Sequence, residues 1–531
     1  MRQWNSWGDS QVKMTVNAKA SVFIQGLLGK GQPLVDASLA DVMAKVPASR
    51  LPEHPLISTD AETRVRHARG QSLPDWLAWR SGDIGVFPDG VALPHTTAQV
   101  AELLALAKQH NWVVIPYGGG TSVVGHINPV ADERPILTLA LTNLNNLIKL
   151  DESSQLATIG AGATGPQVEA LLKPHGYMLG HYPQSFELST LGGWVASRSS
   201  GQQSLHYGRI EQLFAGGHIE TLNGALDIPT LPASSAGPDL REMMMGSEGR
   251  FGVITEATVR VSRCPEHEEF HVYFVPDWAK AKLAVRELVQ QKLPLSMVRL
   301  SNADETRTQL MLAGHAFAIA GLEKVLNWRG AGAGKCMLTI GFTGSLQRIK
   351  FAQTEVSRIL KSFDTVPTGQ VLGKRWHQNR FRAPYLREAL WQLGYAVDTL
   401  ETAVDWQKVT PYMIDVEQSL RNGLMAENET VLAFSHLSHI YTQGSSIYTT
   451  YVFRVGDNYA QTLARWQKLK ADACQVIIKH GGTISHQHGV GQDHAPYLEA
   501  EKGVQGIAAL RALATHFDAD GRLNPHKLLV D

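Results

Sequence analysis

The chain has 531 residues, with 49 Lys and Arg against 49 Asp and Glu, so its formal net charge is zero. A chain this long exceeds one compact hydrophobic core and predicts two or more domains. The lack of a basic surplus argues against a nucleic-acid-binding protein and against a polybasic membrane anchor.

The three cysteines, Cys264, Cys336 and Cys474, are widely spaced and form no CxxC pair. This pattern predicts neither a disulfide framework nor a metal knuckle, and it fits a reducing compartment. The N-terminal residues lack the apolar run of a secretory signal, and no stretch approaches the roughly 20 apolar residues of a membrane helix. We therefore expect a cytoplasmic protein without a transmembrane segment.

The first half of the chain predicts a lead-in followed by a mixed α/β domain. Residues 1–85 contain many polar and Pro breaks and predict a helical segment. A short strand at 91–97, an amphipathic helix at 98–110 and a buried strand at 112–118 follow it. Strands and helices continue to alternate and predict one domain over 86–264. Within it, the Pro-, Ser- and Gly-rich span 221–240 is interpreted as a surface excursion.

The second half predicts an α+β cap and a helical tail. The cap covers 265–458, and the tail covers 459–531 with an interruption at 481–491. The elements expected in the cap are strands at 270–275, 336–344 and 446–455 and a helix at 279–291.

Three loops of small residues carry the strongest functional signal. They are PYGGGTSVVG at 116–125, PQSFELSTLGGW at 183–194 and GSEGRFGVIT at 246–255. Glycine has no Cβ to hold a ligand away, so such loops let backbone N–H groups close on an anion. Three of them suit a long ligand touched at several points, and a dinucleotide is the natural candidate.

The segment Gly160–Gly165 matches the GxGxxG pattern but is not interpreted as a Rossmann fingerprint. Pro166 follows directly, as expected at the first position of a helix. The second strand with an Asp or Glu about 20 residues later is also missing. We interpret the segment as a tight turn between a strand and a helix.

Taken together, the loops resemble the vanillyl-alcohol oxidase / p-cresol methylhydroxylase superfamily, and within it most the alkyldihydroxyacetonephosphate synthases. The likeness covers nearly the whole chain, from RQWNSWGD at 2–9 to NPHKLL at 524–529, and includes PYGGGTS, SIY and SHQHGVG in the right order. The resemblance implies an α+β fold: a two-subdomain FAD-binding domain of the p-cresol methylhydroxylase type, an α+β cap with an antiparallel sheet, and helical N- and C-terminal segments.

The resemblance also implies which residues bind FAD. Some relatives attach the flavin covalently through a His in the first loop, where this chain has Gly120 or Thr121, so we expect non-covalent FAD. The implied cofactor-binding residues are Pro116, Tyr117, Gly118, Gly119, Gly120, Thr121, Ser122, Gln184, Ser185, Phe186, Glu187, Leu188, Ser189, Thr190, Ser197, Arg198, Ser199, Ser200, Glu248, Gly249, Arg250, Phe251, Gly252, Val253 and Ile254.

Tyr448 matches the family tyrosine that transfers a proton beside the flavin. A phenol with a pKa near 10 is a poor base at neutral pH, so its neighbours would have to lower that pKa. The HQH segment has Gln487 where the synthases have a third His. In an extended segment, His486 and His488 would point to the same face. A metal held by these two with His436 or His439 is the less favoured alternative, and we expect none.

Three further residues match family active-site positions. Arg299 and Arg387 offer the bidentate guanidinium that a carboxylate or phosphate group of a substrate requires. The competing interpretation for each arginine is a structural salt bridge. His181 matches as well, and its neighbour Gln184 stands where the family has an Asp.

Two functions follow from the resemblance. The first is an FAD enzyme that exchanges the acyl group of acyl-dihydroxyacetonephosphate for a fatty alcohol through a flavin N5 adduct, in ether-lipid synthesis. Tyr448 would move the carbon-bound proton, and Arg387 would hold the acyl carboxylate. The alternative is an FAD-dependent dehydrogenase or oxidase of a 2-hydroxy acid, of the D-lactate or D-2-hydroxyglutarate type. The expected partner is a small or lipid-like substrate and no nucleic acid; a peripheral membrane contact and a homodimer stay open.

Overall fold

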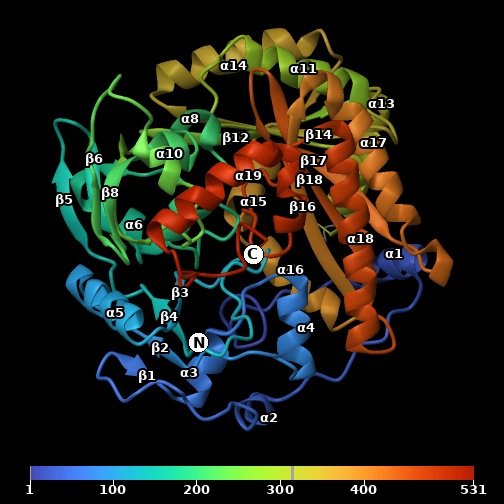
Figure 1. Ribbon diagram of the computed structural model, residues 1–531. Coiled ribbons are helices and arrows are strands. Elements are labelled where there is room, and N and C mark those ends of the chain that lie inside the picture. The colour runs from blue at the N-terminus through green and yellow to red at the C-terminus, as the bar shows by residue number, and fades with distance from the viewer. Residues whose placement is uncertain (1, 313–315, 531) are drawn as a thin grey trace.

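The computed structural model describes residues 2–312 and 316–530. Three sheets of four, five and seven strands, a two-stranded pair and their covering helices make up the described residues. In the view of Figure 1, the C-terminal end lies in the middle of the picture and the N-terminal end lies below it. Within the described ranges, every helix is too short or too polar to cross a bilayer. The lead-in segment contains the helices α1 (Ala18–Leu28), α2 (Leu39–Met43), α3 (Ala61–Arg66) and α4 (Leu73–Ser81).

The first sheet positions the first glycine loop. Its strand order is β1-β2-β4-β3, with β2, β4 and β3 parallel. Helix α5 (Thr97–Gln109) packs Val100 and Leu103 against Val114 and Leu137 of the sheet. The strands are β1 (Ile57–Ser58), β2 (Gly90–Ala92), β3 (Val113–Tyr117) and β4 (Ile136–Ala140). The lead-in thus contributes β1 to this sheet, which the helical interpretation of 1–85 did not include.

The second sheet is antiparallel, in the order β5-β6-β10-β8-β9. Part of the predicted surface excursion forms β9, and 229–240 is mostly exposed. The strands are β5 (Leu147–Asp151), β6 (Leu156–Gly160), β8 (Phe214–Thr221), β9 (Gly224–Ile228) and β10 (Val253–Arg260), beside the small pair β7 (Tyr177–Met178) and β11 (Ser262–Arg263). The helices are α6 (Gly165–Leu172), η1 (Lys173–His175), α7 (Leu191–Ser197), α8 (Ser204–Tyr207), α9 (Ile210–Leu213) and α10 (Leu240–Met244).

The third sheet has seven antiparallel strands in the order β15-β12-β14-β13-β17-β18-β16. The strands are β12 (His267–Val275), β13 (Met297–Ser301), β14 (Cys336–Gly344), β15 (Val366–Pro367), β16 (Tyr395–Asp405), β17 (Leu432–Ile440) and β18 (Gly444–Arg454). The helices of this half are α11 (Trp278–Gln290), α12 (Ala303–Leu312), α13 (Ala316–Trp328), α14 (Leu346–Lys361), α15 (Val371–Asn379), α16 (Ala383–Trp391) and α17 (Trp406–Asn422).

The two faces of this large sheet have different neighbours. Helices α11, α14 and α17 cover its outer side in Figure 1. Side chains alternate along a strand, so Ile447 and Tyr451 enter that core while Tyr448 and Thr450 face the opposite side. That opposite side is turned toward the glycine loops, and the site lies between them.

The tail returns to the first sheet. The cap also contains the short helix η2 (Met425–Glu427). The tail consists of α18 (Tyr459–His480), η3 (Ala495–Tyr497) and α19 (Leu498–Phe517). Leu523 forms a parallel bridge with Val114 of β3 and is buried in that core. The amide of Asn524 donates to the carbonyl oxygens of His126 (3.0 Å) and Glu248 (2.7 Å). The expected mixture of α/β sheets, antiparallel cap and helical ends is confirmed, and the boundaries at 85, 264 and 458 stay a prediction.

Candidate active site

A cavity of about 710 Å³ lies between the glycine loops and the inner face of the large sheet. Every second residue of β17, from Leu432 to Ser438, lines it, as do Tyr448, Thr450 and Val452 of β18. The lining also contains apolar side chains from α1, α12 and α16, among them Ile24, Leu312 and Leu390. The cavity therefore combines polar groups from the loops and the sheet with an apolar portion formed by such side chains.

The first and second loops touch each other at glycine positions. A Cβ on Gly119 would lie 1.8 Å from the carbonyl oxygen of Leu188, and one on Gly118 would lie 2.3 Å from Oγ1 of Thr190. Only glycine fits such an approach, because a side chain would collide with fixed backbone. The two loops consequently form one continuous wall of the cavity.

This wall fits FAD. Three buried hydroxyl groups in the lining, those of Thr190, Ser200 and Ser247, have no hydrogen-bond partner among the described residues. Buried polar groups without a partner cost free energy, so hydroxyls of this kind indicate a polar ligand. With the backbone of 118–120, which lines the cavity, they provide the donors that a pyrophosphate and a ribityl chain require.

Most of the cofactor-binding residues implied by the resemblance line the cavity. Those that do so are Pro116, Tyr117, Gly118, Gly119, Gly120, Thr121, Ser122, Gln184, Ser185, Ser189, Thr190, Ser197, Ser199, Ser200, Glu248, Gly249, Gly252 and Ile254. Seven lie outside the lining: Phe186, Glu187, Leu188, Arg198, Arg250, Phe251 and Val253. Phe251, for example, is in the core and stacks on Phe517.

Glu248 holds the turn that follows the HQH segment. Its two carboxylate oxygens accept the backbone N–H groups of Val490 (2.5 Å) and Gly491 (2.8 Å). His126 Nε2 lies 3.0 Å from the same carboxylate. Glu248 therefore connects the third loop to the tail as well as lining the cavity.

Tyr448 lies in the cavity wall with its ring stacked on His436. The two ring centroids are 5.0 Å apart, and His488 meets Tyr448 edge-on at 5.8 Å. The hydroxyl of Tyr448 donates to Oγ1 of Thr399 at 3.1 Å. Burial raises the pKa of Tyr448 to about 12, against the lowering that a base requires.

The two predicted arginines differ in what surrounds them. Arg299 is 2.7 Å from a carboxylate oxygen of Glu305, and Nδ1 of His436 is 3.0 Å from the same oxygen. Burial alone would raise the pKa of Glu305, but His436 and Arg299 lower it to about 2. The positive charge of Arg299 is thus compensated within the protein.

Arg387 keeps a donor for a ligand. Its Nη1 donates to the carbonyl oxygen of Gln71 at 2.7 Å, and its guanidinium lies 4.2 Å over the ring of Trp76. Its Nη2 is buried in the lining and has no hydrogen-bond partner among the residues that the structure describes. Of the two predicted arginines, Arg387 is therefore the one with an N–H donor left to bind an anionic ligand.

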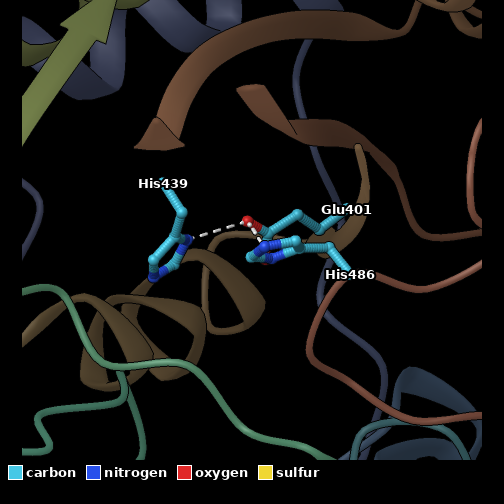
Figure 2. A group of neighbouring side chains, drawn as sticks. All are labelled: Glu401, His439 and His486. Carbon is cyan, nitrogen blue, oxygen red and sulfur yellow. Dashed lines mark hydrogen bonds and ion pairs between the residues drawn. The ribbon is translucent and has the colours of Figure 1, made fainter. Parts of the chain in front are cut away.

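Glu401 of β16 is fully buried between His439 and His486 (Figure 2). Its Oε1 lies 3.3 Å from Nδ1 of His439 and 3.2 Å from Nδ1 of His486. The three side chains are close enough to coordinate one cation. The carboxylate, however, already accepts the hydroxyl of Ser438 and the amide of Gln487, each at 2.6 Å. Ser438, Gln487 and Nδ1 of His439 thus provide hydrogen bonds to Glu401 without an ion, and His486 lies within ion-pair distance.

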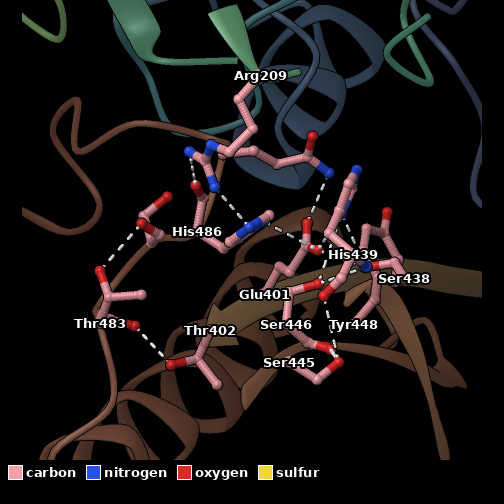
Figure 3. A network of polar contacts seen from close by, with 12 residues as sticks. Arg209, Glu401, Thr402, Ser438, His439, Ser445, Ser446, Tyr448, Thr483 and His486 are labelled. Atoms are coloured by element: carbon pink, nitrogen blue, oxygen red, sulfur yellow. Dashed lines mark hydrogen bonds and ion pairs between the residues drawn. The ribbon is translucent and has the colours of Figure 1, made fainter. Parts of the chain in front are cut away.

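His486 is fixed from the other side by Arg209 (Figure 3) and by Tyr441. Nη1 of Arg209 and the hydroxyl of Tyr441 each lie 2.6 Å from Nε2 of His486. These three residues line a second cavity, of about 1230 Å³, which reaches the exposed Lys502. Burial lowers the pKa of His486 to about 4, so its imidazole is neutral at pH 7.

The predicted common face of His486 and His488 is wrong. His488 lines the first cavity with Tyr448, whereas His486 lines the second. The cause is local: the segment around them consists of bends rather than a strand, and Gly489 takes a φ of 80°. His181 is also outside the first cavity's lining; its Nε2 contacts the hydroxyl of Ser199 at 3.1 Å.

The sequence reasoning missed Glu305, Glu401 and Arg209. Glu401 lies in a strand that the motifs did not mark, and Glu305 lies in α12. Each of these two carboxylates is buried only because another element of the fold packs over it. A signal was present in the residues themselves, since a carboxylate within an apolar stretch is almost never buried without a partner.

Two family models match most of the chain. Residues 88–226 match the "FAD binding domain" model, and residues 264–528 match "FAD linked oxidases, C-terminal domain". Alkyldihydroxyacetonephosphate synthase of Dictyostelium discoideum is 32% identical over 480 residues, 89% of this chain and 78% of that protein.

Solved structures give the same picture. A structure of alkyldihydroxyacetonephosphate synthase matches with a TM-score of 0.85 at 27% identity, over 99% of each chain. p-Cresol methylhydroxylase matches with a TM-score of 0.68 at 13% identity, over 98% of this chain and 99% of that one. At 13% identity the second match shows the shared fold alone.

Proposed function

Because the chain belongs to the alkyldihydroxyacetonephosphate synthase family of FAD-dependent enzymes, we propose that it exchanges the acyl group of acyl-dihydroxyacetonephosphate for a fatty alcohol. The observation that carries this proposal is the composition of the cavity. Polar loops and Arg387 line one part of it, and apolar side chains such as Leu312, Leu390 and Val452 line another. Such a cavity suits a substrate with an anionic head and an aliphatic chain.

FAD, held non-covalently by the three loops, would supply the ring nitrogen that reacts with the dihydroxyacetone carbon. We propose that Arg387 binds the acyl carboxylate with its free Nη2 and so draws the leaving group away from that carbon. The Trp76 ring beneath the guanidinium fixes its plane.

We propose that Tyr448 moves the carbon-bound proton. The stacked His436 fixes the ring, and Arg387 contributes an electrostatic interaction that lowers the pKa of Tyr448 against the larger opposing effect of burial. His488, which meets Tyr448 edge-on, forms part of the same wall. His486 acts at a distance from the substrate, because Arg209 and Tyr441 hold it at the second cavity.

Four further statements belong to the same proposal. The division into 1–85, 86–264, 265–458 and 459–531 is supported by the separate sheets. A cytoplasmic location is supported by three free cysteines, two of them buried. A peripheral membrane contact, suited to an aliphatic substrate, and a homodimer are tested by vesicle flotation and light scattering.

The test uses the purified yellow protein under anaerobic conditions. Labelled fatty acid should exchange into acyl-dihydroxyacetonephosphate, and added fatty alcohol should form the alkyl product, without lasting loss of flavin absorbance. Bleaching by D-lactate or D-2-hydroxyglutarate without any acyl exchange would favour the 2-hydroxy-acid dehydrogenase instead. A colourless protein that does not take up added FAD would contradict both functions.

A further inference from the structure

The exchange reaction contains a proton transfer that Tyr448 does not cover. When the alcohol oxygen forms its bond to carbon, its O–H proton must leave, and the departing carboxylate takes the electron pair of the broken C–O bond. A fatty alcohol is a far weaker acid than an imidazolium, so a general base is required at the oxygen. The base must lie in the cavity with a free lone pair.

We propose that His439, oriented by Glu401, is the base that takes the hydroxyl proton of the incoming alcohol; this proposal rests on the proposed function. His439 lies near the end of β17 and lines the first cavity. Its Nε2 is buried and has no hydrogen-bond partner among the described residues. Its other nitrogen, Nδ1, is 3.3 Å from Oε1 of Glu401.

The contacts of His439 fix which nitrogen carries the proton. A carboxylate only accepts, so Nδ1 of His439 carries the hydrogen and donates it to Glu401. The lone pair of the neutral ring is then on Nε2, the buried atom that has no hydrogen-bond partner among the described residues. This is the arrangement in which a carboxylate orients an imidazole and stabilises the imidazolium formed when it takes a proton.

The other histidines are less suited to this step. Nε2 of His486 faces the two donors Arg209 and Tyr441, so its lone pair is occupied. His436 faces Glu305, whose charge Arg299 already compensates. His488 has no carboxylate partner among the described residues within ion-pair distance.

The negative charge of Glu401, unlike that of Glu305, is not compensated by an arginine among the described residues. Burial would raise its pKa, but the facing His486 and His439 imidazoles lower that pKa well below its usual value, so it stays ionised. Within the described residues, its ion-pair neighbours are these two histidines and no Lys or Arg. Ser438 and Gln487 hold its two oxygens in place. A carboxylate so fixed stabilises positive charge on His439 without moving.

Atoms and charge balance in this step. The alcohol proton passes to Nε2 of His439 as the new C–O bond forms, and it then leaves with the fatty carboxylate or to water. Overall, acyl ester and alcohol give alkyl ether and fatty acid, with no net oxidation. Glu401 is a positioning residue in this scheme, and His439 is the catalytic one.

The first test compares two nucleophiles of equal chain length. With a fatty alcohol, His439→Gln should lower kcat at least about 100-fold, as expected for loss of a general base, with KM for the acyl substrate changed little. With an alkanethiol, which is a far stronger acid than an alcohol and needs less help from a base, the loss should be at least about tenfold smaller. Glu401→Gln should give a smaller loss with the same preference for the thiol.

The matched control is His480→Gln. His480 also pairs with a carboxylate, Asp415 at 2.8 Å, but it lines neither cavity. The substitution His480→Gln should leave the reactions with the alcohol and with the thiol unchanged. Equal losses with alcohol and thiol, or no loss in His439→Gln, would overturn the proposal.

A second measurement is made on the wild-type protein. It needs no turnover, and it still applies if the variants fail to fold. In the ¹⁵N NMR spectrum of the histidine-labelled holoenzyme, the neutral form of His439 should carry its proton on Nδ1, the nitrogen that faces Glu401. A signal for protonated Nε2 would overturn the proposal. If the wild-type enzyme exchanges no fatty acid at all, the proposed function fails, while this spectrum still decides the orientation of His439.

Discussion

Tyr448 and His436 are directly paired across β18 and β17, and their rings stack with 22° between the planes. The phenol therefore has one orientation, with its hydroxyl directed to Thr399. His436 in turn contacts Glu305, so the position of Tyr448 depends on a carboxylate from α12.

Tyr448→Phe should slow the exchange reaction by about 10²- to 10⁴-fold, the usual contribution of one general acid–base group. The yellow colour should remain, because Tyr448 belongs to the cap and not to the glycine loops. Stopped-flow measurement of fatty acid release tests this. Tyr412→Phe, at a buried tyrosine outside both cavities, is the control, and an equal loss there would contradict a specific role.

Gly119→Ala should prevent FAD retention. Its Cβ would lie 1.8 Å from the carbonyl oxygen of Leu188, so the first and second loops would have to separate. Gly26→Ala in α1 meets nothing within 4 Å and should bind FAD normally. The ratio of flavin to protein absorbance after gel filtration measures both, and a yellow Gly119→Ala protein would contradict the proposed pyrophosphate wall.

Arg387→Met should raise KM for the acyl substrate by about 10- to 100-fold, because a charge-assisted hydrogen bond contributes about 1.5–3 kcal/mol. The matched control is Arg299→Met. Its guanidinium is paired with Glu305, so its main effect should be on stability rather than on substrate affinity. Steady-state kinetics in both variants separate the two roles. A larger rise in KM for Arg299→Met would reverse the assignment.

The Glu305 carboxylate should make stability fall at acid pH. Its pKa is about 2 in the folded protein against an ordinary 4.5, so its stabilisation is complete above about pH 4.5 and is lost as the pH falls toward 2. The shift corresponds to about 3 kcal/mol. Urea midpoints measured at pH 7 and pH 3 should differ less in Glu305→Gln than in wild type. An unchanged difference would show that Glu305 does not carry this effect.

Local patterns predicted the cofactor wall well. The strand before Gly118, the helix at 98–110 and the helix after Gly165 appear where the sequence places them, because each depends on short-range periodicity and turn chemistry. The close approach of Gly119 to the carbonyl oxygen of Leu188, in contrast, was not predicted, because it depends on how the two loops pack together.

The contacts of Glu401, His439 and Arg209 could not be predicted in this way. Glu401 and His439 lie on strands separated by β18, and their contact depends on strand order in the large sheet. The alternation rule failed at His486 and His488 because it holds only for extended backbone. Arg209, 277 positions before His486, shows no local pattern for its contact.

The C-terminal segment has a consequence for biosynthesis. Asn524 caps carbonyl groups in the cofactor-binding half, including that of His126, 398 positions earlier. While the ribosome is still making the cap, the nascent cofactor-binding half lacks the last piece of its core, Leu523. Flavin loading in its final form must therefore follow translation of residues 523 and 524.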